Sequence, residues 1–112
     1  PVREERTYQV SAPVLVVEQA SQPANVGQRL ELTGFPFLLG RDLPQLLGEA
    51  DVSRRHAEVN YDPAAQKFTI TDLKSTNGVL VENVFIEPNQ PAEIRRGSRI
   101  WLGQKVVLRL EF

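Results

Sequence analysis

Residues 57–72 read AEVNYDPAAQKFTITD, two runs of alternating apolar and polar residues around a turn-forming segment. Apolar side chains recur at every second position, for example at Val59 in the first run and Ile70 in the second. A period of two places one face of a β-strand against a core and leaves the other face in water. The stretch therefore predicts a β-hairpin whose loop is formed by residues 62–66.

The same alternation continues on both sides of the hairpin, at residues 29–32 before it and residues 106–112 after it. Between the apolar runs lie short segments rich in Gly, Pro and Asn, such as residues 25–27. Many short strands at regular spacing, with turns between them, are typical of an antiparallel β-sandwich. We therefore expect an all-β fold whose only helical segment is a single turn at residues 44–47.

Three dipeptides carry the clearest turn signals. Asn77-Gly78 is a strong signal by itself. Glu82-Asn83 lies between two short apolar runs and predicts a hairpin turn, because Asn tolerates the positive φ that such a turn needs. Gly103-Gln104 also separates two apolar runs and predicts a two-residue turn with Gly in first position.

The chain has 112 residues, of which 41% are apolar and 24% charged, and its net charge is −1. This is the composition of one ordinary globular domain. The charge balance argues against a nucleic-acid or anionic-membrane partner. The longest apolar run, residues 14–17, is far too short for membrane insertion. Because the chain lacks methionine, we expect that it is processed or is a piece of a longer protein.

Cysteine and histidine usage excludes several kinds of chemistry. The sequence has no cysteine and one histidine, so it offers no disulfide scaffold, no thiolate zinc site, no cysteine nucleophile and no histidine metal cluster. We expect neither a metal nor a cofactor. A chain without disulfides suits a reducing compartment, and we therefore expect a cytoplasmic location.

Three polar clusters border predicted strands, and their pooled chemistry is that of an anion site. The clusters are Gly40-Arg41, Ser53-Arg54-Arg55-His56 and Ser75-Thr76-Asn77-Gly78. Loops at one end of a sandwich can converge on a single patch. Guanidinium forks, hydroxyls and loop amides together suit a phosphate group, which carries close to two negative charges and offers three strong acceptor oxygens.

Four segments resemble the forkhead-associated (FHA) domain in the same order: residues 39–41, 53–59, 72–78 and 94–103. The resemblance covers residues 13–112, after a polar lead-in at residues 1–12. It implies a β-sandwich of two sheets with about eleven strands. It also implies binding of phosphothreonine peptides through loops at one end, with a Ser/Thr protein kinase upstream that makes the ligand.

The resemblance also assigns roles to single residues. It implies that Arg41 binds the phosphate, Ser53 donates a hydrogen bond to it, and Arg54 lies beside it. Thr76 is expected near the phosphate or the threonine methyl group, and Asn77 is expected to hold the peptide backbone. Further peptide contacts are expected from Arg55, Asp51 and Lys74. Support of the site without ligand contact is expected from Gly40, His56 and Gly78.

Two positions depart from the family pattern. Lys74 stands where the family usually has a small residue, and Glu82-Asn83 stands where it commonly has Asn-Gly. Neither departure removes a phosphate ligand. Asp51 is expected to disfavour acidic peptide residues C-terminal to the phosphothreonine, because its carboxylate would repel them.

Other residues have simpler structural interpretations. His56 lacks a Ser/Asp arrangement that would form a catalytic triad, and we expect its ring to join neighbouring loops. The cluster of Arg95, Arg96 and Arg99 is most simply a solvated face. Trp101 alternates with two aliphatic residues and is expected to pack in the core or at its rim.

We therefore predict a monomeric phosphothreonine-dependent interaction module in Ser/Thr kinase signalling, without enzymatic activity. The alternative is a phosphate-independent scaffold, or an intramolecular regulatory domain of a larger protein. Thr7, in the lead-in, has two interpretations: a phosphorylation site that folds back into the binding loops, or the polar start of an edge strand.

Overall fold

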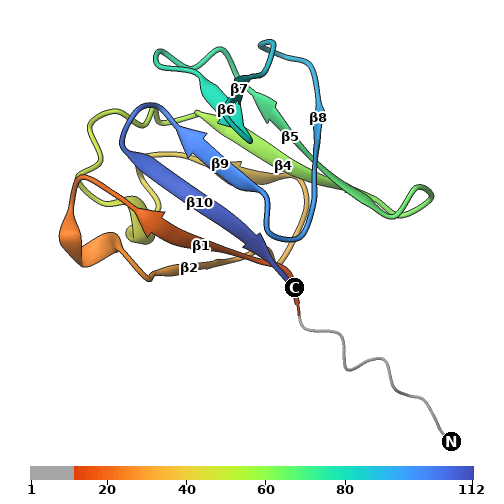
Figure 1. The fold of residues 1–112 in the computed structure, drawn as a ribbon, viewed down its shortest axis with the longest axis horizontal. Helices are drawn as coiled ribbons and strands as arrows, with labels where there is room; N and C mark the ends of the chain where they lie inside the picture. Colours follow the sequence, from red (N-terminus) through yellow and green to blue (C-terminus); the bar gives the residue numbers. More distant parts are fainter. Residues whose placement is uncertain (1–11) are drawn as a thin grey trace, which may run out of the picture.

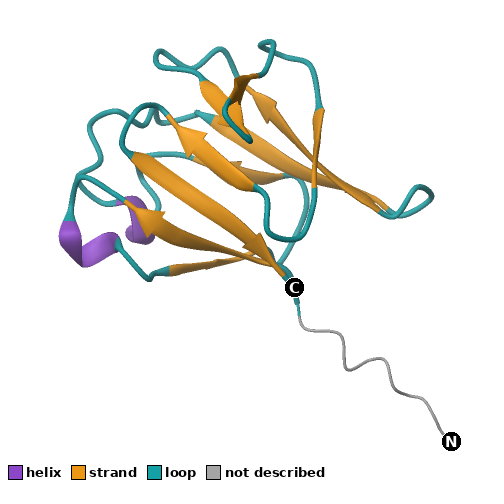
Figure 2. Ribbon diagram, in the orientation of Figure 1, coloured by secondary structure: helices purple, strands orange, loops and turns teal. Residues whose placement is uncertain are grey.

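A computed structural model describes residues 12–112 as two β-sheets packed face to face (Figures 1 and 2). The described strands are β1 (Val14–Gln19), β2 (Arg29–Glu31), β3 (Phe37–Leu39), β4 (Ala57–Asp62), β5 (Lys67–Asp72), β6 (Val79–Val81), β7 (Val84–Phe85), β8 (Ala92–Ile94), β9 (Arg99–Leu102) and β10 (Val106–Glu111). Two short 3₁₀ helices, η2 (Pro23–Asn25) and η3 (Pro44–Leu46), complete the described elements. The predicted all-β sandwich is confirmed, with ten strands in this part of the chain.

The strands form a six-stranded sheet in the order β2-β1-β10-β9-β6-β7 and a four-stranded sheet in the order β3-β4-β5-β8. All recorded neighbours are antiparallel. The predicted hairpin is β4 and β5, paired from Ala57 opposite Asp72 to Asp62 opposite Lys67. Its loop is residues 63–66, one residue shorter than predicted, because Asp62 still belongs to the ladder.

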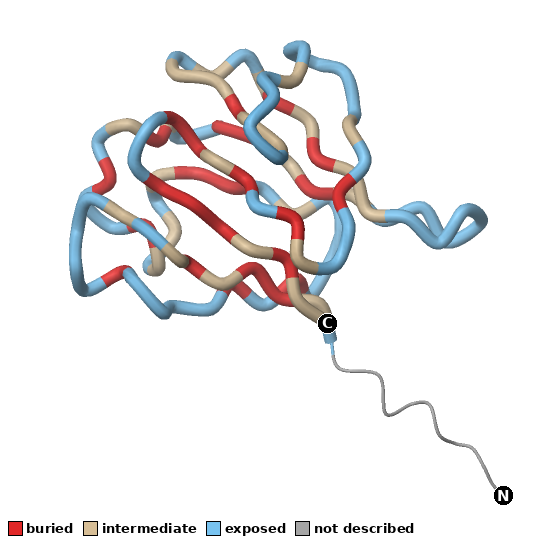
Figure 3. Tube along the Cα trace, in the orientation of Figure 1, coloured by how far each residue is buried: buried red, intermediate tan, exposed pale blue. Residues whose placement is uncertain are grey.

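The core lies between the two sheets, as the buried segments in Figure 3 show. Every second residue of the long strands points into it, for example Val59 and Ile70 from the smaller sheet and Ile100 and Leu108 from the larger one. Each of these four side chains is fully shielded from solvent. Burial of such side chains is the main force that holds the sheets together.

Two of the predicted turns, at Glu82-Asn83 and at residues 44–47, are present, whereas the predicted turn at Gly103-Gln104 differs in length. Glu82 and Asn83 both have positive φ, at 49° and 68°, which is the backbone of a two-residue hairpin turn. The predicted turn at residues 44–47 is the 3₁₀ helix η3. The two-residue turn at Gly103-Gln104 was wrong, because Leu102 pairs with Val106 and leaves a three-residue loop that includes Lys105.

Strand direction determines which loops share an end of the sandwich. The pairing of Leu39 with Ala57, and of Ala57 with Asp72, brings the loops after β3, before β4 and after β5 to one end. The β4–β5 hairpin loop lies at the opposite end (Figure 1).

The start and finish of the described chain also lie away from these loops. Val14 pairs with Glu111, and Figure 1 shows the two ends of the described chain close together. Thr7 and nearly all of the predicted lead-in lie outside the described residues. No helix between residues 12 and 112 is long and apolar enough to cross a membrane.

Candidate functional site

The loops after β3, before β4 and after β5 are called the first, second and third loops. The first and second loops are joined at Gly40, where their backbones approach each other closely. Gly40 is buried, and a Cβ atom added to it would lie 1.8 Å from the carbonyl oxygen of Arg54. The Arg41 amide donates to the Ser53 carbonyl at 3.1 Å, and the His56 amide donates to the Leu39 carbonyl at 3.0 Å. Glycine at position 40 therefore allows the backbones of Arg41 and Ser53 to lie side by side.

Ser53 connects the second loop to the third. Its hydroxyl oxygen accepts a hydrogen bond from the backbone amide of Thr76 at 3.2 Å. A serine hydroxyl has one donor hydrogen and two acceptor lone pairs. The contact with Thr76 uses a lone pair, so the hydroxyl hydrogen remains available for an external acceptor such as a phosphate oxygen.

The ring of His56 also connects the second loop to the third. Its fully buried ring accepts a hydrogen bond at Nδ1 from the Ser53 amide, 3.0 Å away, and its Nε2 lies 2.8 Å from the Gly78 carbonyl oxygen. Because Nδ1 is an acceptor here, the proton of the neutral ring is on Nε2 and is donated to Gly78. Burial lowers the pKa of His56, although the Gly78 bond and the charge of Asp72 oppose this effect. His56 is therefore a neutral clamp between loops.

The third loop is shaped by two side-chain caps. The Asp72 carboxylate accepts from the Ser75 amide at 2.9 Å, and the Ser75 hydroxyl accepts from the Gly78 amide at 3.0 Å. Lys74, between them, has a φ of 58°. A positive φ favours glycine or asparagine, which accounts for the small residue that the FHA pattern usually has here.

Asn77 is held in place by the loop that precedes β4. Its side-chain amide nitrogen donates to the Asp51 carbonyl at 2.9 Å. The amide oxygen of Asn77 remains as an acceptor for a backbone N–H of a ligand. The half-buried Asp51 side chain thus belongs to the same end of the molecule as Ser53 and Asn77.

Gly103 supports the site and was not predicted from the sequence. Its amide donates to the Gly78 carbonyl at 3.0 Å, the oxygen that His56 also contacts. A Cβ atom at Gly103 would lie 3.0 Å from the Asp51 carbonyl oxygen and 3.4 Å from the Asn77 Cβ. The sequence offers two signals here, a glycine directly after an apolar strand and the last position of the FHA-like segment 94–103, but neither predicts a role in the site.

The structure thus brings Arg41, Ser53, Thr76, Asn77 and Asp51 to one rim. Arg41, Ser53 and Asn77 are half-buried, and Thr76 is exposed. The remaining predicted contact residues are exposed, namely Arg54, Arg55 and Lys74. Leu38, Gly40, Asp42, Leu43 and Arg54 border a shallow hollow of about 240 Å³ beside this rim. Loops that are already bonded to one another lose little conformational freedom when an anion binds.

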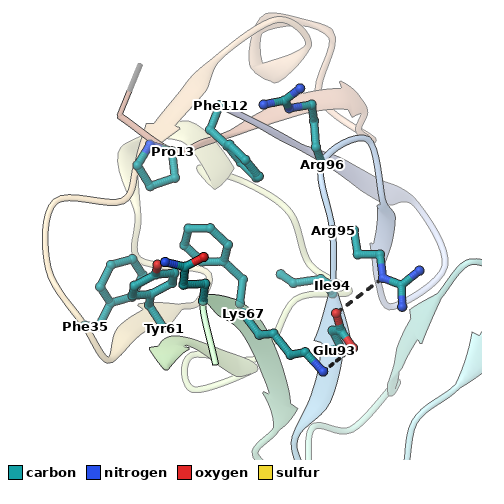
Figure 4. Close-up of a pocket in the computed structure, with 11 residues that line it drawn as sticks. Pro13, Phe35, Tyr61, Lys67, Glu93, Ile94, Arg95, Arg96 and Phe112 are labelled. Carbon is teal, nitrogen blue, oxygen red and sulfur yellow. Dashed lines mark hydrogen bonds and ion pairs between the residues drawn. The ribbon is translucent and has the colours of Figure 1, made fainter. Parts of the chain in front are cut away.

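A larger cleft, of about 530 Å³, lies at the opposite end, beside the hairpin loop (Figure 4). Its walls include four aromatic rings whose neighbouring centroids are 4.8 to 6.2 Å apart, those of Phe35, Tyr61, Phe68 and Phe112. The Arg96 guanidinium lies 4.7 Å from the centre of the Phe112 ring. The sequence did not predict this cleft, because its residues come from segments far apart in the chain.

The two sites differ in chemistry. Glu93 at the edge of the aromatic cleft pairs with Lys67 at 3.6 Å and Arg95 at 3.3 Å (Figure 4), which leaves an apolar floor. The loop end instead presents hydroxyl and amide groups beside arginines. An anion site is therefore better supported by the loops than by the larger cleft.

Comparison with known proteins agrees with this architecture. The FHA domain family matches residues 37–103. The fork-head transcriptional regulator FHL1 of Candida albicans is 38% identical over 52 residues, which cover 46% of this chain and 4% of that protein. This chain therefore matches only a small part of that regulator.

Solved FHA domains resemble the whole sandwich. One, from a structural and functional analysis of phosphothreonine-dependent FHA domain interactions, is 28% identical with a TM-score of 0.71, and the match covers 91% of this chain and 97% of that chain. The kinase-interacting FHA domain of the Arabidopsis kinase associated protein phosphatase is 27% identical with a TM-score of 0.65, covering 91% and 97%.

The fold and its interlocked loops define a β-sandwich that presents a binding rim at one end. The chain belongs to the FHA domain family, whose profile matches most of it. This is a family of interaction modules and not of enzymes.

Proposed function

We propose that this FHA domain binds proteins through a phosphorylated threonine, held by the loops that follow β3 and β5 and precede β4. Arg41 supplies the principal charge, and Ser53 donates its free hydroxyl hydrogen to the phosphate. Thr76 lies against the phosphate or the threonine methyl group, and Asn77 holds the neighbouring peptide backbone. Arg54 adds positive charge beside them.

The contact between Ser53 Oγ and the Thr76 amide is the observation that carries this proposal. Together with the Arg41–Ser53 backbone bond, it joins residues from all three loops at one point. Phosphate binds well where several hydrogen-bond donors and a guanidinium converge, and each hydrogen bond to a charged group contributes about 1.5–3 kcal/mol.

The related structures support a role in Ser/Thr kinase signalling. One was solved in a study of phosphothreonine-dependent interactions, and the Arabidopsis domain is described as kinase-interacting. We propose that a Ser/Thr kinase makes the ligand of this domain. Arg55, Asp51 and Lys74 border the same rim and are proposed to tune the choice of flanking residues.

A phosphate-independent scaffold is the second candidate, and the aromatic cleft favours it (Figure 4). Phe35 and Tyr61 are 39% and 37% exposed, and their rings lie 6.2 Å apart, so together they form one apolar patch. Such a surface suits a protein contact that does not depend on phosphorylation.

A degenerate peptide library separates the two candidates. We expect residues 1–112 to enrich phosphothreonine peptides over the matched threonine peptides, and Arg41→Ala to abolish the enrichment. Lys67→Ala is the matched control, because it removes an exposed cation at the other end of the sandwich. Equal recovery of phosphorylated and unphosphorylated peptides would favour the scaffold.

A further inference from the structure

The larger sheet carries a row of apolar side chains on its outer face. Phe85 lies directly opposite Leu80, Leu80 opposite Trp101, and Trp101 opposite Val107. Residues directly opposite one another in antiparallel strands project from the same face of the sheet. Val107 is only 1% exposed, so the accessible part of this line is formed by Phe85, Leu80 and Trp101, across β7, β6 and β9, and we call these three residues the outer row.

The outer row faces away from the core. Successive residues of a strand point to opposite faces, and the strand neighbours Val79, Ile100, Leu102 and Leu108 are buried between the sheets. Phe85 is 66% exposed, and Leu80 opposite it is half-buried. Trp101 is half-buried on β9, between β10 and β6 in the sheet. The edge of this row thus offers apolar surface that nothing in the described chain covers.

The outer row begins at the binding loops. A Cβ atom on Gly78 would lie 3.0 Å from the Phe85 ring, so the ring packs against the residue that follows Asn77. On β9, Trp101 is two residues before Gly103, which lies against Asp51 and Asn77. A ligand held by Asn77 therefore meets Phe85 as soon as its chain leaves the loops in that direction.

The neighbouring row on the same face is ionic. Arg99 lies opposite Arg109, and the Glu18 carboxylate bonds both, at 2.8 Å to Arg99. The Arg99 amide also donates to the Glu82 carboxylate at 2.7 Å. The outer row therefore lies between the binding loops on one side and the paired charges on the other. It is one side chain wide.

We propose that the outer row binds apolar side chains of the phosphorylated partner itself, at positions flanking the phosphothreonine. The inference rests on the proposed function. Two inter-strand spacings of roughly 4.8 Å make the row about 10 Å long. An extended peptide covers that length in about three residues. The domain therefore selects ligands with one or two aliphatic or aromatic residues within a few positions of the phosphothreonine.

Trp101 is the only tryptophan of the chain and reports directly on the outer row. The test uses a phosphothreonine peptide with serine at every flanking position, and a set in which leucine replaces one serine at a time. At one or two positions we expect leucine to tighten binding about tenfold, the effect of burying one such side chain. The same peptides should shift Trp101 emission to the blue, whereas the all-serine peptide should bind without a shift.

Variants locate the effect. Phe85→Ser should abolish the preference for leucine, and Phe85→Leu should keep most of it. Tyr61→Ser, in the aromatic cleft, is the matched control. Affinity for the all-serine peptide should be the same in all three variants, which shows that the phosphate loops are intact.

The outcomes separate this inference from the proposed function. If the all-serine phosphopeptide binds but the leucine scan is flat and Trp101 does not respond, the outer row is not a peptide surface and the inference fails alone. A blue shift that grows with protein concentration without peptide would assign the row to a second copy of the chain, and would also overturn it. If no phosphopeptide binds, both proposals fail.

Discussion

The hydroxyl oxygen of Ser53 lies 3.2 Å from the backbone nitrogen of Thr76, a residue 23 positions later in the chain. Two loops are thereby fixed to each other at the point where a phosphate is proposed to bind. The serine is oriented before a ligand arrives, and its remaining hydrogen points to no fixed partner in the loop. Preorganisation of this kind raises affinity by reducing what must be ordered on binding.

Ser53→Ala should weaken phosphopeptide binding by about 1–3 kcal/mol, because it removes one hydrogen bond to a charged group. It also removes the acceptor of the Thr76 amide. Isothermal titration with one phosphothreonine peptide measures the loss. Thr33→Ala, an exposed hydroxyl deletion after β2, should bind like the parent chain. Unchanged affinity in Ser53→Ala would remove Ser53 from the site.

Gly40→Ala should destabilise the fold by about 3 kcal/mol or more, because the new Cβ would overlap backbone that has little room to move. The clash is with the Arg54 carbonyl oxygen, 1.8 Å from the Cβ position. Gly34→Ala is the matched control, since nothing lies within 4 Å of its Cβ position. Urea unfolding of both variants measures the difference in stability. Similar midpoints would contradict the close approach of Gly40 to the Arg54 carbonyl oxygen.

His56 should make stability depend on pH near neutrality. Burial lowers the pKa of His56 below its ordinary value of 6.5. The unfolded chain therefore takes up a proton as the pH falls through about 6.5, whereas the folded chain does not until a lower pH. The free energy of unfolding should accordingly decrease from pH 7.5 towards pH 5.

Urea unfolding at several pH values measures this slope, and His56→Gln provides the comparison. The variant should be less stable at pH 7.5, because a buried clamp between Ser53 and Gly78 is altered. Its slope between pH 7.5 and 5 should be smaller than that of the parent chain. A parent chain that becomes more stable on acidification would contradict the neutral, buried imidazole.

Glu49 is a buried carboxylate that the binding site does not use. It is 1% exposed and accepts hydrogen bonds from the Ser21 hydroxyl at 2.5 Å, the Gln22 amide at 3.0 Å and the Asn25 side chain at 2.8 Å. Burial raises the pKa of Glu49, but these hydrogen bonds outweigh it and the pKa is lowered. The carboxylate therefore holds the segment around η2 against the loop that follows η3.

Glu49→Ala should lower the free energy of unfolding by about 2–4 kcal/mol, since it leaves several buried donors without an acceptor. Glu87→Ala, an exposed carboxylate, is the control and should change stability by less than about 0.5 kcal/mol. Chemical denaturation measures both. Equal stability of the two variants would show that the Glu49 cluster contributes nothing to the fold.

Most of the fold could be predicted because a β-strand has a local sequence signal, the alternation of apolar and polar residues. Alternation identified β4, β5 and β10, and Glu82-Asn83 identified the β6–β7 turn through its tolerance of positive φ. The loop at Gly103 was predicted one residue too short, because its length depends on the register of Leu102 with Val106. Register is a property of two paired strands and cannot be read from one of them.

The residues of the site likewise fall into two groups, those in local sequence motifs and those that depend on contacts between distant segments. The roles expected of Arg41, Ser53 and Asn77 come from the resemblance to the FHA domain, whose motifs are short continuous segments of the chain. The support from Gly103, and the aromatic cleft around Phe68, depend on contacts between distant segments. No local pattern encodes such contacts, so only the folded structure shows them.

The most direct test of the account is a calorimetric titration of residues 1–112 with two peptides that differ only in phosphorylation of one threonine. The phosphopeptide should bind with a dissociation constant on the order of micromolar, as expected for a few charged hydrogen bonds less the cost of association. The unphosphorylated peptide should give no saturable heat. Equal affinity for the two peptides would contradict phosphothreonine recognition by Arg41 and Ser53.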